Sequence, residues 1–579
     1  MKRKTKTVCR GSAQLAVACL AAACMVILLP GRCNNPVDST LYLVSTNDCH
    51  GKYLDSSYVD GELQQPSLCA INRYVDSIRN AVGKRNVLLL DGGDCLQGDY
   101  ASYYYNFVDT VSPHLFARVA DYMGYDAVCV GNHDVETGHP VYDRVARDLA
   151  SRGIPFLAAN AVRVSDGKPY FGEYKVFRRA GAKVLVIGYT NANIKAWLDG
   201  RLWSGIDFKS LTDVVQDDVD RISARVKPDV VVVLAHTGVG RDDPGLENQG
   251  YELYTTLRGV DFVICGHDHA SYAAANDSIC IMDGNSYCKY FCVGELIMHR
   301  KGGKINSREF HTKIVKVDAG RVDSAMSARF NPDYRKVRDY MFREVGELRF
   351  PVVTRDAYRG MCYYMNLNHT VALEETGADI SLLAPLTYNG VIPAGKVLYR
   401  DMFTLYPYEN QLFVVKLAGR EVREYLEKSY DLWIGTFDGS HVLRISRKDN
   451  QRYGGVSWSF VNRPYSFDSA AGLDYTVDVT KPFGSRVKIT SMADGTPFDE
   501  DRVYDVATSS YRSNVCGWTD GNTVKMREMR EILCEWIERN GTVTPEMAGD
   551  PGVVGTWRFV PDGTAGKALE KDYKLLFGE

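Results

Sequence analysis

The sequence predicts an α/β domain followed by a smaller α+β domain, and three observations support this prediction. From about residue 40 to residue 317, short β-branched runs alternate with longer amphipathic runs, as in a layered α/β domain. Most of the short runs are apolar throughout, as expected for strands that are buried on both faces. The chain has 579 residues, which exceeds the size at which a single hydrophobic core keeps growing.

The chain begins with a segment that has the build of a secretory leader. Residues 2–6 are mostly basic, residues 15–29 are mostly apolar, and a polar stretch follows. We expect a signal segment over residues 1–33 and export to the periplasm or the cell surface. A retained anchor is the alternative, since the apolar run is close to the lower length limit for a spanning helix. Cys33 resembles the lipidated cysteine of a bacterial lipoprotein, although residues 29–32 lack the small residue that usually precedes it.

Six strand candidates define the first domain, which we expect over residues 40–320. The strands are expected at Leu41–Ser45, Asn86–Leu90, Ala127–Val130, Lys183–Ile187, Val230–Leu234 and Asp261–Cys265. Helices are expected between them at Leu68–Val82 and Leu211–Val226.

The remainder of the chain divides into a linker, a second domain and a tail. A charged, helix-prone stretch at residues 332–348 predicts a helical linker over residues 321–354. Residues 355–540 mix helix signals with short strands and many aromatic side chains, which predicts an α+β domain. The helices expected in this domain are Gly419–Ser429 and Val524–Arg539. Residues 541–579 are rich in glycine and proline and carry little signal, so we expect them to form a tail beyond the second domain.

The overall composition gives no basic footprint for a nucleic-acid polymer. The formal net charge is −3, so we expect no polymer partner. Of the 15 cysteines, four lie in the leader and an odd number remains, so the remaining thiols cannot all form disulfides. We expect most of them to be small buried hydrophobic residues.

Five of the six strand candidates run directly into polar residues of the types that bind metals. These residues are Asp48 and His50, Asp94, Asn132 with His133 and Asp134, His236, and His267 with His269. The carboxyl ends of the strands in an α/β sheet lie along one edge, where their loops converge. Each motif alone is equally well explained as a turn or a structural histidine. Five of them in one domain favour a single site.

The residue types predict which ions this site binds. Mixed nitrogen and oxygen ligands suit zinc, manganese, iron or cobalt better than calcium or magnesium. All of these residues except His133 and Asp134 are candidate ligands. Seven ligands are too many for one tetrahedral ion, whereas two ions roughly 3.5 to 4 Å apart and bridged by one carboxylate would use them all. Such a pair can polarise a phosphoryl group and lower the pKa of a shared water. The pattern therefore predicts two divalent ions and hydrolysis of a phosphate ester.

The complete set of motifs resembles the signature of the calcineurin-like metallophosphoesterases. The matching motifs are Asp48-x-His50, Gly92-Gly93-Asp94, Gly131-Asn132-His133-Asp134, His236 and Gly266-His267-x-His269. This resemblance implies a four-layer sandwich in which two sheets are flanked by helices. It also implies one metal held by Asp48, His50, Asp94 and His269, and a second held by Asp94, Asn132, His236 and His267. Asp94 would then be the bridge.

The resemblance also implies roles beside the metals. His133 matches the position that donates a hydrogen bond or a proton to the phosphate and the leaving group, and Asp134 or Glu136 would orient it. Asn132 would contact the substrate as well as a metal.

The second domain resembles the C-terminal domain of secreted 5′-nucleotidases, through residues 405–410 and 417–427. Residues 464–472 and 506–512 are more similar to the branch that acts on 2′,3′-cyclic nucleotides and 3′-nucleotides. The arginine-containing loop of many 5′-nucleotidases is replaced here by residues 384–390. This departure leaves phosphate contact by that arginine in doubt.

The resemblance places Tyr465, Phe467 and Tyr511 at a nucleobase site. Stacking of a base on an aromatic ring gives about 1 to 3 kcal/mol and tolerates any base. The alternative is that these aromatic residues belong to the core of the domain.

We therefore expect a two-metal hydrolase of nucleotide phosphate esters that acts as a 2′,3′-cyclic-nucleotide phosphodiesterase and 3′-nucleotidase. The first alternative is a 5′-nucleotidase or nucleotide-sugar hydrolase. The second is a catalytically silent, nucleotide-binding surface protein. The expected partner is a small nucleotide, and membrane attachment is expected only through the leader or a lipid.

Overall fold

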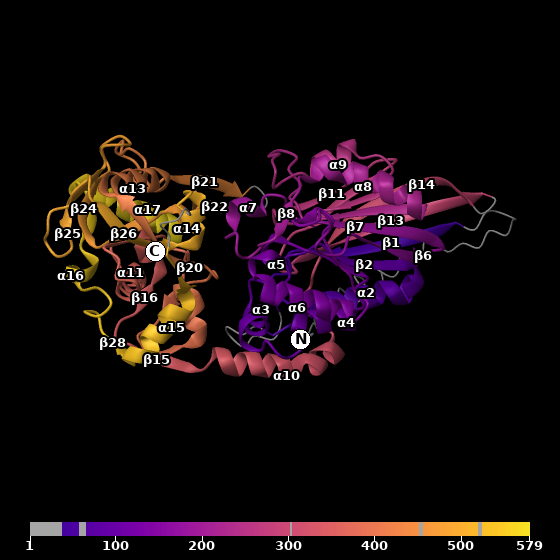
Figure 1. Ribbon diagram of the computed structural model, residues 1–579, viewed down its shortest axis with the longest axis horizontal. Helices are drawn as coiled ribbons and strands as arrows, with labels where there is room; N and C mark the ends of the chain where they lie inside the picture. The colour runs from indigo at the N-terminus through magenta and orange to yellow at the C-terminus, as the bar shows by residue number, and fades with distance from the viewer. Residues whose placement is uncertain (1–37, 57–64, 302–303, 451–454, 519–523, 579) are drawn as a thin grey trace, which may run out of the picture. The chain divides into compact units, whose positions relative to one another are not determined.

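The computed structural model describes residues 38–56, 65–301, 304–450, 455–518 and 524–578 (Figure 1). The described chain forms two compact units. Residues 38–193 and 203–331 make up the first unit, apart from the stretch around residue 60, and residues 194–202 and 332–578 make up the second.

The leader and Cys33 lie outside the described residues, so the expectations about export and lipidation are not addressed by the fold. Within the described part of the chain, no helix is both long enough and apolar enough to span a bilayer.

Two six-stranded sheets form the centre of the first unit. The first sheet has the order β14-β13-β1-β2-β3-β4 and the second has the order β11-β12-β10-β9-β7-β6. The strands of the first sheet are β1 (Ser39–Thr46), β2 (Val87–Asp91), β3 (Ala127–Cys129), β4 (Phe156–Leu157), β13 (Tyr290–Lys301) and β14 (Lys304–Lys316). Those of the second are β6 (Tyr174–Arg179), β7 (Ala182–Tyr189), β9 (Val230–Ala235), β10 (Phe262–Ile264), β11 (Ser271–Ala275) and β12 (Cys280–Gly284).

Apolar strands explain why these sheets pack face to face. Alternate residues of β1, β2, β7 and β9, such as Leu43, Leu88, Val186 and Val232, meet in one fully buried cluster between the sheets. The intervening residues of β7 and β9 face outward, where α8 (Leu211–Val226) covers them. Strands buried on both faces are therefore apolar along their whole length.

Helices complete the four layers. In Figure 1, α8 and α9 (Gly250–Thr256) lie along one side of the paired sheets, and α2, α4 and α6 lie along the other. These last three helices are Leu68–Val82, Leu115–Met123 and His139–Ala150. Short helices of the first unit occur at α3 (Tyr100–Tyr103), η2 (Tyr104–Val108) and α5 (Asn132–Glu136), whereas the short helix α7 (Ile194–Trp197) belongs to the second unit. The predicted four-layer sandwich is confirmed.

All six strands predicted in the first unit run parallel to a neighbouring strand, so the carboxyl ends of neighbouring strands lie at the same edge of each sheet. β1 pairs parallel with β2 and β2 with β3, while β9 pairs parallel with β7 and β10. The polar residues that follow β1, β2 and β3 therefore lie at one edge of their sheet, as do those that follow β9 and β10.

The second unit is built around a five-stranded sheet of order β23-β17-β26-β20-β27. These strands are β17 (Ile380–Leu383), β20 (Gln411–Ala418), β23 (Ser469–Ala471), β26 (Val503–Ser509) and β27 (Val524–Glu528). A three-stranded sheet joins β24 (Leu473–Asp478), β25 (Val487–Met492) and β29 (Trp557–Val560), and another joins β15 (Glu344–Leu348), β19 (Gly395–Leu398) and β28 (Thr542–Val543). Two-stranded pairs form between β16 (Val352–Val353) and β18 (Val391–Ile392) and between β21 (Ile445–Asn450) and β22 (Gly455–Phe460).

Helices pack on these sheets of the second unit. They are α11 (Tyr363–Thr376), α13 (Gly419–Trp433), α14 (Ser510–Val515), α15 (Met529–Asn540) and α17 (Gly563–Phe577), with short turns at α12 (Met402–Leu405), η5 (Pro464–Ser466) and α16 (Pro551–Val554). The predicted α+β second domain is confirmed.

The linker differs from its prediction. The helix α10 runs over Ser324–Met341 with Pro332 inside it, and the rest of the expected helix forms the strand β15. The division between the two compact units falls within α10, at residue 332.

The expected tail is wrong. Its strand β29 pairs in parallel with β24, and Trp557 and Phe559 are buried in the main core of the second unit. The α17 residue Asp572 is fully buried and accepts hydrogen bonds from the backbone N–H groups of Val442 and Leu443 at 2.7 and 2.9 Å. The end of the chain is therefore part of the second unit.

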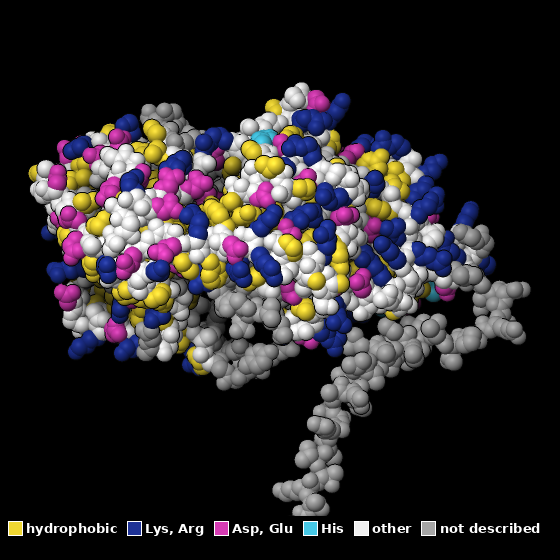
Figure 2. All heavy atoms as spheres, turned by 90° about the horizontal axis from the view of Figure 1, so that it is seen from below, with side chains coloured by type: hydrophobic (Ala, Val, Ile, Leu, Met, Phe, Trp, Pro, Cys, Tyr) yellow, Lys and Arg dark blue, Asp and Glu magenta, His cyan; other side chains and the backbone are white. Residues whose placement is uncertain are grey.

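The charges on the surface are mixed in sign. On the face shown in Figure 2, both basic and acidic side chains are present, and lysine and arginine are the more frequent toward the right of the view.

Candidate metal centre

The seven predicted metal ligands follow the carboxyl ends of five strands of the first unit. Asp48 and His50 come after β1, Asp94 after β2, Asn132 after β3, His236 after β9, and His267 and His269 after β10. Six of these side chains form two groups whose ligand atoms lie within 4.8 Å of one another and could hold a metal ion: Asp48 with His50 and His269, and Asp94 with His236 and His267.

In the first group, two imidazoles and one carboxylate converge. The Nε2 atoms of His50 and His269 lie 2.9 Å apart. The Asp48 Oδ1 atom lies 3.7 Å from His269 Nε2 and 4.0 Å from His50 Nε2. These separations are close to those between ligands that share one ion, because metal–ligand bonds of about 2.0 to 2.2 Å place tetrahedral ligand atoms a little over 3 Å apart.

In the second group, the amide of Asn132 joins the acidic and imidazole ligands. His236 Nε2 lies 3.1 Å from Asp94 Oδ2 and 3.0 Å from Asn132 Oδ1. The same Asn132 oxygen lies 2.8 Å from His267 Nδ1. The structure thus brings together all four residues that the resemblance assigned to the second metal.

Backbone carbonyls fix the orientation of two of the imidazoles. His50 Nδ1 lies 3.1 Å from the Gln97 carbonyl oxygen, and His236 Nδ1 lies 2.8 Å from the Gly92 carbonyl oxygen. A carbonyl only accepts, so each Nδ1 carries a proton and each Nε2 faces the other residues of the centre. This arrangement is typical of histidines that bind metals.

The charged groups of this site are buried and close together. Burial raises the pKa of Asp48 to about 7, although His236 opposes that shift. Burial also acts to lower the pKa of His236, but the carboxylate of Asp94 raises it to about 10. Because carboxylates and imidazoles crowd one another in a largely buried site, divalent ions would suit this donor set.

The backbone at the ligands is strained. Five of the seven ligand residues have a positive φ, namely Asp48 at 48°, His50 at 46°, Asp94 at 57°, His267 at 83° and His269 at 55°. Residues other than glycine rarely adopt this conformation, which costs of order 1 to 3 kcal/mol each and is concentrated at functional sites. The fold therefore maintains this centre at a conformational cost.

A close contact explains one glycine of the motif after β3. A Cβ added to Gly131 would lie 2.1 Å from Asp94 Oδ1 and 2.3 Å from the Asp94 backbone nitrogen. Both atoms belong to Asp94, a predicted ligand that cannot move without leaving its group with His236 and His267.

The variant Gly131→Ala is therefore expected to displace Asp94 and to lower the bound metal below two ions per chain. Metal analysis of the purified protein by mass spectrometry measures this directly. Gly245→Ala is the matched control, since no atom lies within 4 Å of its added Cβ and its φ is ordinary. A Gly131→Ala protein with full metal content would contradict the prediction.

His133 lies at the edge of the centre and is oriented by Glu136. Its ring centroid is 5.4 Å from that of His50, and its Nδ1 lies 2.5 Å from Glu136 Oε2. Although burial acts to lower the pKa of His133, the carboxylates of Asp94 and Glu136 raise it to about 10. His133 is therefore positively charged at neutral pH, and its side chain is one-third exposed.

Asp134 contacts the loop of Asp94 instead of His133. Its carboxylate accepts hydrogen bonds from the backbone N–H groups of Asp94, Cys95, Leu96 and Gly131 at 2.8 to 3.1 Å. Of the two carboxylates expected to orient His133, only Glu136 does so, and the expectation of a catalytic role for Asp134 is corrected to a structural one.

Two neighbours of the ligands were not predicted. Asn47 donates from Nδ2 to Asp48 Oδ2 at 2.6 Å, and it precedes Asp48 directly in the sequence. The Tyr287 ring lies 5.0 Å from that of His50 and 5.7 Å from that of His269. Tyr287 has no motif around it, so only the fold places it beside the ligands.

In the second unit, Tyr465 and Tyr511 lie together. Their ring centroids are 6.1 Å apart with an interplanar angle of 87°, and Tyr465 is 37% exposed. Phe467 is fully buried and stacks on Trp433 with centroids 5.6 Å apart. The expectation that Phe467 binds substrate is therefore wrong, because its ring is enclosed in the core.

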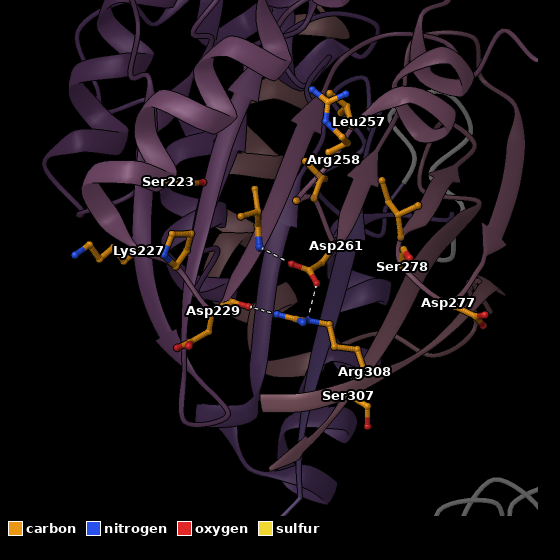
Figure 3. A pocket seen from close by; sticks show the side chains of 15 residues that line it. Ser223, Lys227, Asp229, Leu257, Arg258, Asp261, Asp277, Ser278, Ser307 and Arg308 are labelled. Carbon is orange, nitrogen blue, oxygen red and sulfur yellow. Dashed lines mark hydrogen bonds and ion pairs between the residues drawn. The ribbon is translucent and has the colours of Figure 1, made fainter. Parts of the chain in front are cut away.

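A separate pocket of the first unit lies at the amino ends of β9 and β10, opposite the ends that carry the metal ligands (Figure 3). Arg308 pairs with Asp261 there at 3.1 Å, and burial raises the pKa of Asp261 to about 6. In Figure 3 the side chains of Lys227, Arg258 and Asp277 point away from one another. This pocket does not gather groups for chemistry.

Two family models match the chain. Calcineurin-like phosphoesterase matches residues 43–271, which contain all seven predicted ligands. The C-terminal domain of 5′-nucleotidase matches residues 344–519, which contain Tyr465 and Tyr511.

Individual relatives match over most of the chain. A 2′,3′-cyclic-nucleotide 2′-phosphodiesterase/3′-nucleotidase of Salmonella typhimurium is 23% identical over 91% of this chain and 90% of its own length. A trifunctional nucleotide phosphoesterase protein of Bacillus subtilis is 24% identical over 87% of this chain, which spans only 38% of that relative. The crystal structure of a putative 5′-nucleotidase from Staphylococcus aureus has the same fold, with a TM-score of 0.73 and 20% identity over 90% of this chain and 100% of that one.

Proposed function

Since this chain joins a calcineurin-like phosphoesterase domain to a 5′-nucleotidase C-terminal domain and is a metal-dependent phosphoester hydrolase, we propose that it hydrolyses phosphate esters of nucleotides. The observation that carries the proposal is the pair of ligand groups at one edge of the first unit. We propose Asp94 as the residue shared by two ions, which would be zinc, manganese, iron or cobalt given the mixed nitrogen and oxygen ligands. When bound, such a pair supplies charge for the phosphoryl oxygens and an activated water.

His133 is proposed as the group that protonates the leaving oxygen. Its pKa of about 10 keeps a proton on the ring at neutral pH, and its one-third exposure leaves that ring accessible. Because Glu136 contacts Nδ1, the Nε2–H is the proton directed away from this carboxylate. General acid catalysis of this kind contributes about 10² to 10⁴ in rate.

Tyr465 and Tyr511 of the second unit are proposed to contact the nucleobase. One aromatic face of this kind binds any base with comparable affinity, which suits an enzyme that acts on nucleotides regardless of the base.

The cyclic-nucleotide and 3′-nucleotide branch is the proposed specificity. Its support is the similarity of residues 464–472 and 506–512 to that branch and the absence of arginine from the loop at residues 384–390. Relatives named for that activity match 87–91% of the chain. A 5′-nucleotidase is the second candidate, since relatives with that name also match.

An assay of the full chain tests this proposal. The purified protein, supplied with manganese or zinc, is given 2′,3′-cyclic AMP, 3′-AMP, 5′-AMP and a nucleotide sugar, and phosphate release is measured. We expect kcat/KM to be highest for 2′,3′-cyclic AMP or 3′-AMP. A clear preference for 5′-AMP would replace the cyclic branch, and absence of turnover on all four substrates would reject the hydrolase.

We also propose that the protein is exported, because a basic segment followed by an apolar one opens the chain. A nucleotide hydrolase outside the cytoplasm would act on nucleotides that cannot cross a membrane.

A further inference from the structure

A buried ion pair lies directly behind the two tyrosines of the second unit. Arg512 Nη2 is 2.7 Å from Asp468 Oδ2, and the residues are 7% and 2% exposed. Removing two charges from water is costly unless geometry and further hydrogen bonds compensate. The further contacts of Arg512 and Asp468 show which segments this buried pair holds together.

The arginine connects the two tyrosine-bearing segments. Arg512 follows Tyr511 in α14, and its guanidinium centre lies 5.8 Å from the Tyr511 ring centroid. The same Nη2 that contacts Asp468 also donates to the backbone oxygen of Tyr465 at 2.7 Å. One guanidinium group thus fixes the backbone of Tyr465 relative to the start of α14.

The aspartate connects this arrangement to a third element. The hydroxyl of Tyr425 in α13 donates to Asp468 Oδ2 at 2.9 Å, and Ser429 Oγ donates to the Asp468 backbone oxygen at 2.8 Å. The α13 helix packs through Val422 and Leu426 into the main core of the second unit. Asp468 is therefore held by a rigid helix, and Arg512 is held by Asp468.

We propose that Arg512, Asp468 and Tyr425 are positioning residues that fix the separation and tilt of Tyr465 and Tyr511 for a nucleobase. This inference rests on the proposed function of the two tyrosines. With their backbones fixed, the tyrosines have only side-chain rotation to lose when a base binds, and a pre-organised site loses less entropy on binding.

The decisive measurement is the binding of adenosine to the full chain by titration calorimetry. Steady-state kinetics with 3′-AMP as the substrate are measured on the same proteins. Asp468→Asn removes the charge and keeps the shape, and Tyr425→Phe removes one hydroxyl. We expect each variant to raise both the Kd for adenosine and the KM for the nucleotide substrate by about threefold or more, with kcat changed by less than about twofold.

A matched control exists in the same unit. Asp431 pairs with the buried Arg486 at 2.8 Å, and Arg486 is 2% exposed. Asp431→Asn makes the same chemical change next to a different buried arginine, and it is expected to leave the Kd for adenosine unchanged. An equal loss of affinity in this control would overturn the proposal, because the effect would then be general loosening of the unit.

The variant Tyr511→Ala distinguishes a failure of the positioning role from a failure of the proposed base-binding role of the two tyrosines. If this variant binds adenosine normally, the tyrosines do not hold the base and both ideas fail. If Tyr511→Ala weakens adenosine binding by about tenfold while Asp468→Asn and Tyr425→Phe do not, the function survives and the positioning role is rejected. If Asp468→Asn does not unfold in a cooperative thermal transition, this variant is not properly folded. The Kd of Tyr425→Phe for adenosine then decides whether the positioning role holds.

Discussion

Asp94→Asn is expected to lower kcat/KM by more than about 100-fold, which exceeds the usual effect of altering a residue that only supports a metal ligand. Asp94 lies at 3.1 Å from His236 Nε2, and its other oxygen accepts from the His133 backbone nitrogen at 2.8 Å. An amide keeps this shape but removes the negative charge and one metal-binding lone pair. Because we propose that Asp94 serves both ions, the variant should also contain fewer than two metals per chain.

Metal content and activity together test the bridging role. Loss of one ion alone would assign Asp94 to a single metal, and near-full activity would reject the bridge. Asp121→Asn on the exposed surface of α4 is the control, with wild-type metal content and rate expected.

Glu136→Gln is expected to move the alkaline limb of the pH–rate profile to lower pH by at least about one unit. The carboxylates of Asp94 and Glu136 raise the pKa of His133 to about 10 against the effect of burial. A step that needs this proton operates below that pKa and is lost as the pH rises through it. Without the Glu136 charge the pKa falls, and one unit corresponds to about 1.4 kcal/mol, close to the lower end of the roughly 1.5 to 3 kcal/mol that a hydrogen bond to a charged group contributes.

The profile of kcat between pH 6 and 10.5 measures this shift, a range chosen to bracket roughly the ordinary and raised pKa values of histidine. Glu252→Gln, on the exposed face of α9, should leave the profile unchanged. His133→Asn should lower kcat by about 10² to 10³ and abolish the alkaline limb, while keeping two metals. An unshifted limb in Glu136→Gln would show that another group carries the proton.

The fold of the first unit was predictable because its strands are buried on both faces. Such strands are apolar runs that end abruptly at polar residues, so β1, β2 and β9 and the ligands after them stand out in the sequence. The helix Leu68–Val82 was predicted with its observed bounds, since it begins at a serine cap and ends at Gly83. Regular periodicity and clear caps are local signals, and these succeeded.

Other features depend on contacts that the sequence does not display. Phe467 shares its aromatic character with Tyr465, and only the packing on Trp433 shows that one ring is enclosed and the other exposed. Asp134 and Glu136 are both acidic and close to His133, and backbone direction alone decides which one meets the imidazole.

Two secondary-structure errors have the same origin. Val524–Glu528 continues the apolar pattern of α15, but it pairs with β20 and is a strand. Pro332 marks a favourable helix start, yet the helix begins at Ser324 and continues through it. In the first case, pairing with a distant strand outweighed the local helix preference. In the second case, packing of the turns before Pro332 outweighed the local preference for a helix start.

The incorporation of the chain end into the second unit affects how this protein can be divided for study. A fragment ended near residue 541 would contain the whole stretch that the family model matches, residues 344–519, but would lack β29 and α17. Tyr430 and Tyr475, which pack against Trp557, would then face solvent, and the amides of Val442 and Leu443 would lose their buried acceptor. Truncation screens and crystallisation trials should therefore keep the last forty residues, roughly one further layer of the domain, or they will sample an aggregation-prone remnant.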